Sequence, residues 1–217
     1  MTGLSLKGRT SVSSPGTQKT MGARITAGIR RALILAALAF SSCEPTLERR
    51  VFEYERQVNA GNVDRVLALF SDDATVQAQG TLSLTGKEAL RGMVEWDSVV
   101  HTHLTFYDMA TEGDTVLANV VESNDWLAAL GIQEILHPTT RVVFRNGLIA
   151  RMESETDSSD SQAIRGSLNA LLEWALAERP HVVRSLVSDA GFHYNAESAV
   201  RWLGLLREWR DAVGENN

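Results

Sequence analysis

The sequence has little cysteine, little proline and few aromatic residues: one Cys, four Pro and 6% Phe, Trp and Tyr among 217 residues. A single cysteine cannot form an intramolecular disulfide, and it cannot supply the thiolates of a structural zinc cluster. The chain also lacks a glycine-rich phosphate loop, a Gly-x-Ser-x-Gly elbow and a His-Glu-x-x-His motif. Nucleotide-binding, serine-hydrolase and zinc-protease functions therefore have no support.

Basic residues are scarce outside the N-terminus. Six of the 21 Lys and Arg lie in the first 43 residues, which contain no Asp or Glu. The remaining residues therefore include 15 basic and 27 acidic side chains and have a net charge of −12. Because residues 44–217 are so acidic, neither a nucleic-acid partner nor electrostatic binding to anionic lipid is expected. The apolar content of 44% nevertheless supports a folded domain with a core.

Residues 1–43 are predicted to be a leader and signal peptide. Beginning at Met21, or at an upstream Met1, arginines precede a nine-residue apolar run at 32–40, and Ser41 and Ser42 follow it. A permanent membrane span needs about 20 apolar residues. The pattern therefore predicts an export signal rather than a span.

The only cysteine, Cys43, lies where signal cleavage is expected. The stretch Phe40-Ser41-Ser42-Cys43 resembles a bacterial lipobox, with Phe40 where the pattern usually has Leu. The resemblance implies that Cys43 is the lipid attachment site of a membrane-anchored lipoprotein of the bacterial cell envelope. The alternative is ordinary cleavage near Ala37-x-Ala39, which would give a soluble periplasmic or secreted protein.

The next part of the chain alternates between helical and strand periods. Helices are expected at 48–60, after Asn62, and after the capping box Thr85-Gly86-Lys87-Glu88. Strands are expected at 74–79, 82–84, 101–112, 114–125, 133–145 and 148–157, with a short helical turn at 126–131. Helices followed by antiparallel strands predict an α+β fold, with helices packed on one face of a curved sheet.

A polar stretch at 157–161 is interpreted as a domain boundary, because three amphipathic helices follow it. The predicted organisation is thus a leader at 1–43, an α+β domain at 44–157 and a helical extension at 158–217. The helices need an apolar partner, which could be the sheet domain or a second subunit.

The order of elements, together with several short stretches, resembles the SnoaL-like, nuclear transport factor 2-like superfamily over about 48–156. These stretches are Phe52-Glu53-Tyr54, Asn59-Ala60-Gly61-Asn62-Val63, Leu69-Phe70-Ser71-Asp72-Asp73-Ala74-Thr75-Val76, Thr85-Gly86-Lys87-Glu88-Ala89-Leu90 and Asn146-Gly147-Leu148-Ile149. The resemblance implies a cone-shaped half-barrel with an apolar pocket between the first helix and the concave face of the sheet. It says little about function, because this fold includes isomerases, cyclases, dehydratases, epoxide hydrolases and binding modules.

The resemblance to ketosteroid isomerases of this fold is incomplete at the catalytic positions. Tyr54 matches their oxyanion-donor tyrosine, but their general base falls on Ala78 and their second donor falls near Thr140. A methyl group cannot accept a proton, so an isomerase reaction is not expected. The Arg-x-Asp motif of epoxide hydrolases of this fold is absent.

Asp97, His101 and His103 are the most suggestive catalytic candidates outside that resemblance. Two histidines two residues apart on a strand share a face, and Asp97 could orient one of them as a general base. The same three side chains could instead bind a metal, or be ordinary exposed residues. No metal site and no cofactor is predicted.

Glu122 and Asn124 are expected on the same strand face as Val116, Ala118 and Val120. In a pocket, Glu122 could serve as an acid; at a solvated strand end it would do nothing. His137 precedes Pro138 and is interpreted as marking a strand irregularity. The candidates are thus Tyr54, Asp97, His101, His103 and Glu122 for catalysis, and Trp96, Asn124 and Trp126 for ligand binding.

These observations predict an exported domain that binds a small apolar molecule in its cone. One alternative is a cyclase, dehydratase or hydrolase that uses the pocket acids and bases. The other is an interaction module that dimerises through the sheet and the tail helices, whose Trp174, Trp202 and Trp209 could mark a partner surface.

Overall fold

The computed structural model describes residues 46–78, 82–188 and 191–214. The predicted signal peptide and the predicted lipid attachment site, Cys43, lie outside these residues. The division of the chain at 43/44 and at 157/158 stays a prediction. Within the described ranges, no helix has both the length and the hydrophobicity that crossing a membrane requires.

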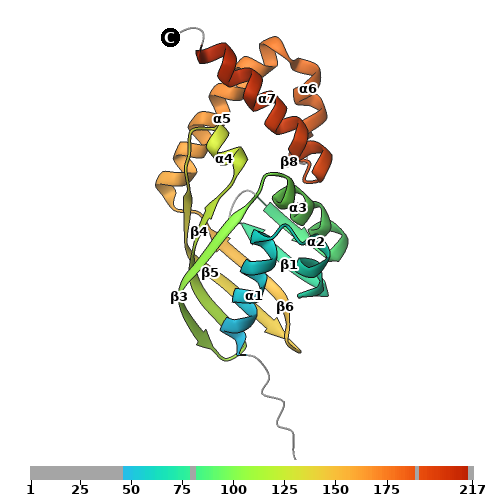
Figure 1. Ribbon diagram of the computed structural model, residues 1–217, viewed down its shortest axis with the longest axis vertical. Coiled ribbons are helices and arrows are strands. Elements are labelled where there is room, and N and C mark those ends of the chain that lie inside the picture. The colour runs from blue at the N-terminus through green and yellow to red at the C-terminus, as the bar shows by residue number, and fades with distance from the viewer. Residues whose placement is uncertain (1–45, 79–81, 189–190, 215–217) are drawn as a thin grey trace, which may run out of the picture. The chain divides into compact units, whose positions relative to one another are not determined.

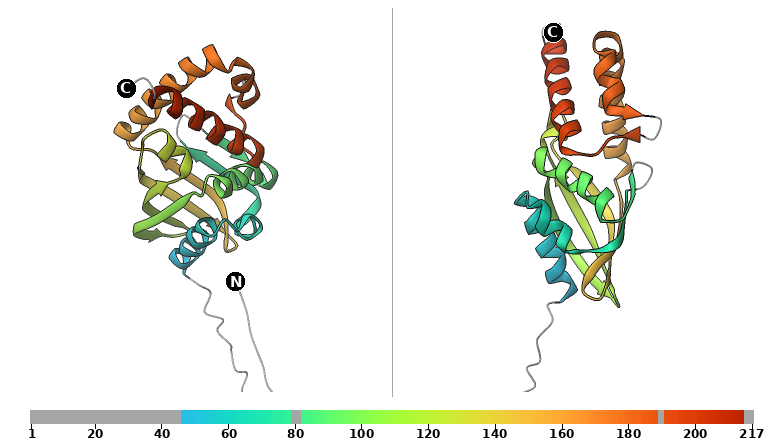
Figure 2. Two further views of the ribbon diagram at one scale, coloured as in Figure 1. Left: turned by 45° about the horizontal axis from the view of Figure 1, so that its top comes forward. Right: turned by 90° about the vertical axis from the view of Figure 1, so that its right-hand side faces the viewer.

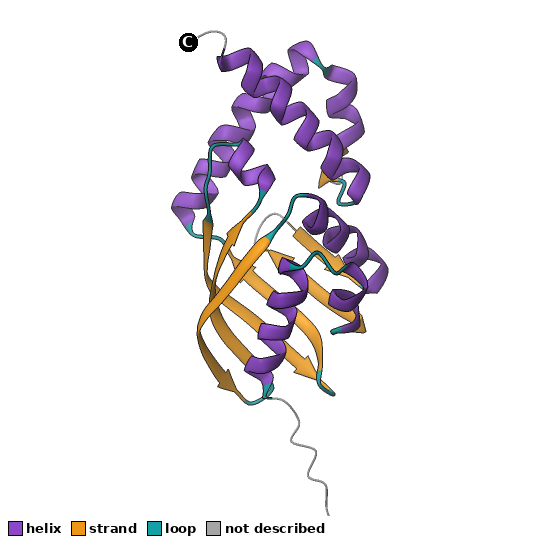
Figure 3. Cartoon of the chain, viewed as in Figure 1, coloured by secondary structure: helices purple, strands orange, loops and turns teal. Residues whose placement is uncertain are grey.

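Six strands form one curved, open sheet in the order β2-β1-β6-β5-β4-β3 (Figures 1 and 3). Every neighbouring pair is antiparallel except β1 and β6, which run parallel. The strands are β1 (Phe70–Ala78), β2 (Leu82–Thr85), β3 (His103–Glu112), β4 (Thr115–Ser123), β5 (Ile135–Arg145) and β6 (Leu148–Glu155). The predicted α+β class, with helices on one side of a curved sheet, is confirmed.

Three helices precede strand β3: α1 (Leu47–Asn59), α2 (Val63–Ala68) and α3 (Lys87–Val99). Helix α1 begins at Thr46, whose hydroxyl accepts a hydrogen bond from the Arg49 amide, and lies along the concave face beside β3 and β4 (Figure 1). Its Tyr54 ring meets Phe70 and Phe106 edge-on, with centroids 5.7 and 6.1 Å apart. These aromatic contacts join α1 to β1, near one edge of the sheet, and to β3 at the other edge.

The helical extension packs on the sheet domain, which settles one question that the sequence left open. It comprises α5 (Ser158–Glu178), α6 (Pro180–Leu186), the two-residue strands β7 (Val187–Ser188) and β8 (Gly191–Phe192), and α7 (Ala196–Gly214). Helix α7 contacts α3 and the short α4 (Asp125–Ala129), as Figure 2 shows. A second apolar cluster joins Trp96 of α3, and Val100 directly after this helix, to Leu171 of α5 and Trp202 of α7. Each such buried side chain contributes roughly 1.5–3 kcal/mol, so the extension is held firmly.

Two predicted helix caps are wrong. Asn62 makes no side-chain capping bond, because its amide donates to Gln57 Oε1 at 2.8 Å instead. Helix α3 is preceded by Gly86 at φ 85°, a backbone conformation that moves Thr85 out of the capping position. Asn195 caps the last helix, since its Oδ1 accepts from the Ser198 amide at 2.8 Å.

Candidate functional site

Two carboxyl groups lie at the end of the sheet where β4 leads into α4. Glu122 continues the inward-facing series Val116, Ala118 and Val120 of β4, as its strand parity predicts. Asp97 lies in the last turn of α3, next to the buried Trp96. The apolar core of the cone adjoins this acidic pair, so the pair forms the polar end of an otherwise apolar interior.

Glu122 is held by two side chains rather than by solvent. His137 Nε2 lies 3.1 Å from one carboxylate oxygen, and Asn124 Nδ2 donates to the other at 2.9 Å. The other ring nitrogen of His137 lies 3.3 Å from the Thr156 hydroxyl. The exposed fractions of the His137 and Glu122 side chains are 10% and 24%, so His137 is nearly enclosed and Glu122 is partly shielded from solvent.

Asp97 has the most unusual acidity in this group. Removal from water raises the pKa of its carboxyl from 3.8 to about 7, and the negative charge of Glu122 adds to the rise. A hydrogen bond from the Thr102 hydroxyl, at 3.2 Å, opposes it. Asp97 is therefore present in both protonation states near neutral pH, and can either donate or accept a proton.

Two tyrosines share this environment. Burial raises the pKa of Tyr54 far above its ordinary value, and the charges of Asp97 and Glu122 raise it further. The same causes, in the same order, raise the pKa of Tyr194 to about 12. Both phenols therefore remain protonated at neutral pH and can donate hydrogen bonds.

A bulge in β5 turns His137 and Thr140 toward the same interior. Val120 pairs with His137 while Ala118 pairs with Thr140, so β5 has one residue more than β4 over this interval. The irregularity predicted at His137-Pro138 is confirmed. Thr140 is 2% exposed, and among the described residues its hydroxyl has no hydrogen-bond partner. Buried hydroxyls nearly always have a partner, so the Thr140 hydroxyl is an exception among the buried polar groups of this interior.

The predicted cluster of Asp97, His101 and His103 does not form. His101 precedes β3 in a left-handed conformation, φ 52°, so the two histidines do not share a strand face. The His101 ring instead lies 2.7 Å from Asp125, with 76% of its side chain exposed. His103 is exposed beside Asn59. In the described residues no group of three or more His, Cys, Asp or Glu side chains is arranged to hold a metal ion.

The predicted ligand-binding residues occupy different positions. Asn124 caps α4, accepting from the Leu127 amide at 2.8 Å while it donates to Glu122. Trp96 and Trp126 both belong to the apolar cluster shared with the helical extension. The buried Trp126 indole nitrogen lacks a hydrogen-bond partner among the residues that the structure describes. Whether these residues contact a ligand stays a prediction, as do the catalytic roles.

Sequence reasoning missed His137 and Tyr194 as members of this group. Pro138 indicated the irregularity, but the consequence, a histidine turned inward beside Glu122, depends on the register of β4 and β5. Tyr194 lies in a short connection before α7, with no periodic pattern around it. Nothing in the sequence connects it with residues 97 and 122.

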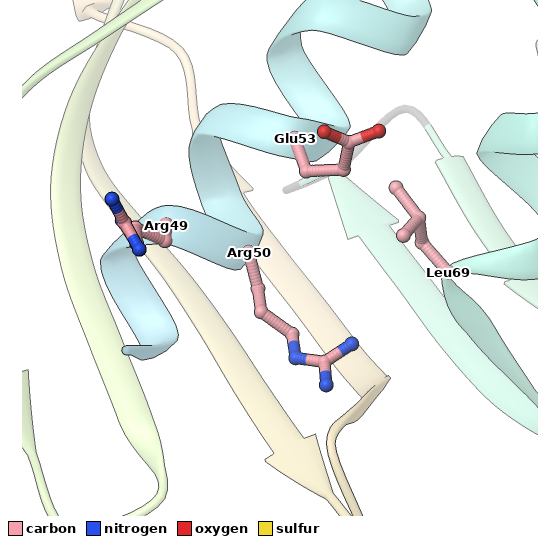
Figure 4. Close-up of a pocket in the computed structure, with 4 residues that line it drawn as sticks. All are labelled: Arg49, Arg50, Glu53 and Leu69. Atoms are coloured by element: carbon pink, nitrogen blue, oxygen red, sulfur yellow. The ribbon is translucent and has the colours of Figure 1, made fainter. Parts of the chain in front are cut away.

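Two surface hollows lie elsewhere. One, of about 300 Å³, is lined by Arg49, Arg50, Glu53 and Leu69, and Figure 4 shows the two guanidinium groups pointing apart. The other, of about 530 Å³, is lined mainly by polar side chains of β1, β5 and β6. None of the candidate residues lines either hollow. We place the candidate site at the acidic pair because Asp97, the carboxyl with the most unusual acidity, is there. The unpartnered Thr140 hydroxyl lies further along the inner face of the sheet, opposite Ala118.

Comparison with known proteins is informative for the first part of the chain. The family model of the SnoaL-like domain matches residues 49–152. The epoxide hydrolase/cyclase-like enzyme SalBIII, of pyran ring formation in salinomycin, is 18% identical, with a TM-score of 0.47 over 52% of this chain and 92% of its own. An M. tuberculosis LEH-like epoxide hydrolase is 16% identical, with a TM-score of 0.46 over 57% of this chain and 92% of its own. A putative polyketide cyclase from Sinorhizobium meliloti is 21% identical, with a TM-score of 0.41 over 49% and 93%. No curated protein matches the chain.

Proposed function

Because residues 49–152 are a SnoaL-like domain, we propose that its cone binds a small, mostly apolar molecule that carries one hydrogen-bond acceptor. The observation that carries this proposal is Asp97, a carboxyl at the end of an apolar interior with a pKa of about 7. In its protonated form Asp97 donates a hydrogen bond to a neutral acceptor.

A fluorescent ketone tests the proposal directly. Prodan is a neutral, apolar naphthalene dye with a single carbonyl oxygen, and its emission depends on hydrogen bonding to that oxygen. We expect saturable binding to the full-length chain, weakening about tenfold as the pH rises through 7 and Asp97 loses its proton. Asp97→Asn keeps a donor at every pH, so it should bind the dye with a flat pH profile. Absence of saturable binding, or an unchanged profile in Asp97→Asn, would contradict the proposal.

The same carboxyl favours a second function, proton transfer on the bound molecule in a cyclase, dehydratase or hydrolase type of reaction. A general acid or base works best when its pKa is near the operating pH, and Asp97 meets that condition. Glu122 and His137 would then be positioning residues that keep the Asp97 proton available. Turnover of a substrate with a bell-shaped pH profile, lost in Asp97→Asn, distinguishes this function from binding alone.

We also propose export and lipid anchoring through Cys43. The support is the basic, apolar and small-residue order of residues 21–43. Mass spectrometry of the membrane fraction should find acylated Cys43 as the N-terminal residue, and Cys43→Ser should release the protein. Ser42→Ala, which keeps the cysteine, is the matched control. An unmodified Cys43 in the mature protein would exclude the anchor.

A homodimer remains a further proposal. Leu176, Val200 and Val213 of the extension are each more than 40% exposed, and such apolar side chains gain most from an apolar partner. Light scattering of the full-length chain measures the mass in solution. A monomer at all concentrations would rule the dimer out.

A further inference from the structure

The connection between β8 and α7 reaches the end of the sheet that holds the acidic pair. The ring of Tyr194 packs edge-on against Trp96, with centroids 5.4 Å apart, and against Phe192 at 6.4 Å. Trp96 is the immediate neighbour of Asp97 on α3. Tyr194 therefore belongs to the helical extension in sequence, but it packs on α3 against the residue next to Asp97.

Gly92 permits this approach. A Cβ atom on Gly92 would lie 2.3 Å from the carbonyl oxygen of Tyr194, a distance that no side chain tolerates. The backbone of α3 and the backbone around Tyr194 thus meet directly. Such close contact is the usual reason for a glycine inside a helix, where it otherwise costs about 1 kcal/mol.

The segment that contains Tyr194 is fixed on both sides. The Ser198 hydroxyl donates to the carbonyl oxygens of His193 and Asn195, and the His193 amide donates to the Leu186 carbonyl at 3.2 Å. Trp202, one turn further along α7, packs against Phe192 with centroids 5.1 Å apart. The position of Tyr194 relative to α3 is therefore determined by backbone bonds and ring contacts on both flanks.

The electrostatic environment agrees with this placement. Tyr194 is close enough to Asp97 and Glu122 for both charges to oppose its ionisation, in addition to the effect of burial. The phenol thus shares the desolvated space of the two carboxyls. Its hydroxyl therefore remains protonated, and a hydrogen-bond donor, at neutral pH.

We propose that Tyr194 completes the ligand site of the SnoaL-like domain from outside that domain, by donating a hydrogen bond to the acceptor oxygen of a neutral carbonyl compound while its ring and Trp96 form an apolar wall. This inference rests on the proposed binding function, and it specifies the ligand class. The two donors, Asp97 and Tyr194, come from α3 and from the extension. A carboxylic acid would be repelled by Glu122, whose hydrogen bonds are already taken by His137 and Asn124. A protonated amine has no lone pair, so it would leave the Tyr194 donor unused.

Prodan binding to the full-length chain tests this role. Tyr194→Phe keeps the ring contact with Trp96 and removes only the hydroxyl. We expect the dye to bind about five- to tenfold more weakly and its bound emission to move to shorter wavelength, because its carbonyl has lost a donor. A role of Tyr194 in packing alone would leave the emission unchanged. Tyr194→Ala should weaken binding further, since the apolar wall is lost as well.

Tyr107→Phe is the matched control, because Tyr107 is an exposed tyrosine of β3. It should bind the dye as the wild type does. If the wild type binds Prodan and Tyr194→Phe is indistinguishable from Tyr107→Phe in affinity and emission, the role of Tyr194 is refuted while the proposed function stands. If the wild type does not bind the dye, the proposed function fails and this inference fails with it. If naphthylamine binds more tightly than Prodan, the assignment of the ligand to the carbonyl compounds is overturned in favour of an amine.

Discussion

Glu122 and His137 meet across two neighbouring strands, with the histidine Nε2 3.1 Å from a carboxylate oxygen. Val120 stands opposite His137 and Glu122 stands opposite Ile135, so the two side chains are diagonal neighbours on the inner face of the sheet. This contact fixes the position of the Glu122 carboxylate at the end of the apolar interior. That charge, together with burial, moves the pKa of Asp97 to about 7.

Stability should fall as the pH rises from about 4 to 7. The pKa of Asp97 is higher in the folded protein than its ordinary 3.8, so the folded state binds more protons over this interval and loses that advantage above 7. Asp97→Asn should be more stable than the wild type at pH 8, by on the order of 2–4 kcal/mol. Urea unfolding at several pH values measures both effects. Asp72→Asn, at an exposed position of β1, is the control, and an identical slope in the wild type and Asp97→Asn would contradict the assignment.

Glu122→Gln should lower the pKa of Asp97. The substitution removes the negative charge that adds to the effect of burial, while glutamine retains an oxygen that can accept from His137 or Asn124. A carbon-13 NMR titration of the aspartate carboxyls should show the resonance with the highest midpoint move to lower pH. The same resonance should be absent from Asp97→Asn. If Glu122→Gln leaves this midpoint unchanged, the charge of Glu122 does not contribute to the raised pKa of Asp97.

Two buried threonines should respond in opposite directions to replacement by valine. Thr140→Val replaces a hydroxyl that has no partner within the described part of the chain, so it should stabilise the unliganded protein by about 1 kcal/mol. Thr102→Val removes the hydrogen bond to Asp97 and should destabilise the protein by about 1 kcal/mol. Thermal unfolding compares them at equal volume change. Destabilisation by Thr140→Val would indicate that its hydroxyl is already satisfied, for instance by water.

Replacement of two helical glycines by alanine should change the stability of the protein in opposite directions. Gly92→Ala forces a Cβ atom toward the Tyr194 carbonyl and should destabilise the protein by about 1–3 kcal/mol. Gly204→Ala on α7, where nothing lies within 4 Å, should stabilise it by up to about 1 kcal/mol. Both variants gain the same helix propensity. The difference between their stabilities, measured by calorimetry, therefore reports the close approach of the extension to α3. Equal effects at the two positions would show that the two backbones do not meet.

The sequence by itself determined the fold class, the order of helices and strands, and the family of the first domain. These properties depend on residues that are close together in the sequence. Examples are the alternation of β4, the turn at Asn146-Gly147 and the apolar stripe of α1, and a single sequence is enough to identify such patterns. It also placed Glu122 on the inner face, because strand parity needs only counting from Val116.

The membership of the site was decided by tertiary structure. The parity of His137 and Thr140 depends on one extra residue in β5 relative to β4, and the left-handed turn at His101 separates it from His103. Tyr194 reaches Trp96 only because α7 packs on α3 and Gly92 leaves room for its backbone. Burial and distance between charges set the acidity of Asp97, and both arise when segments far apart in the chain pack together.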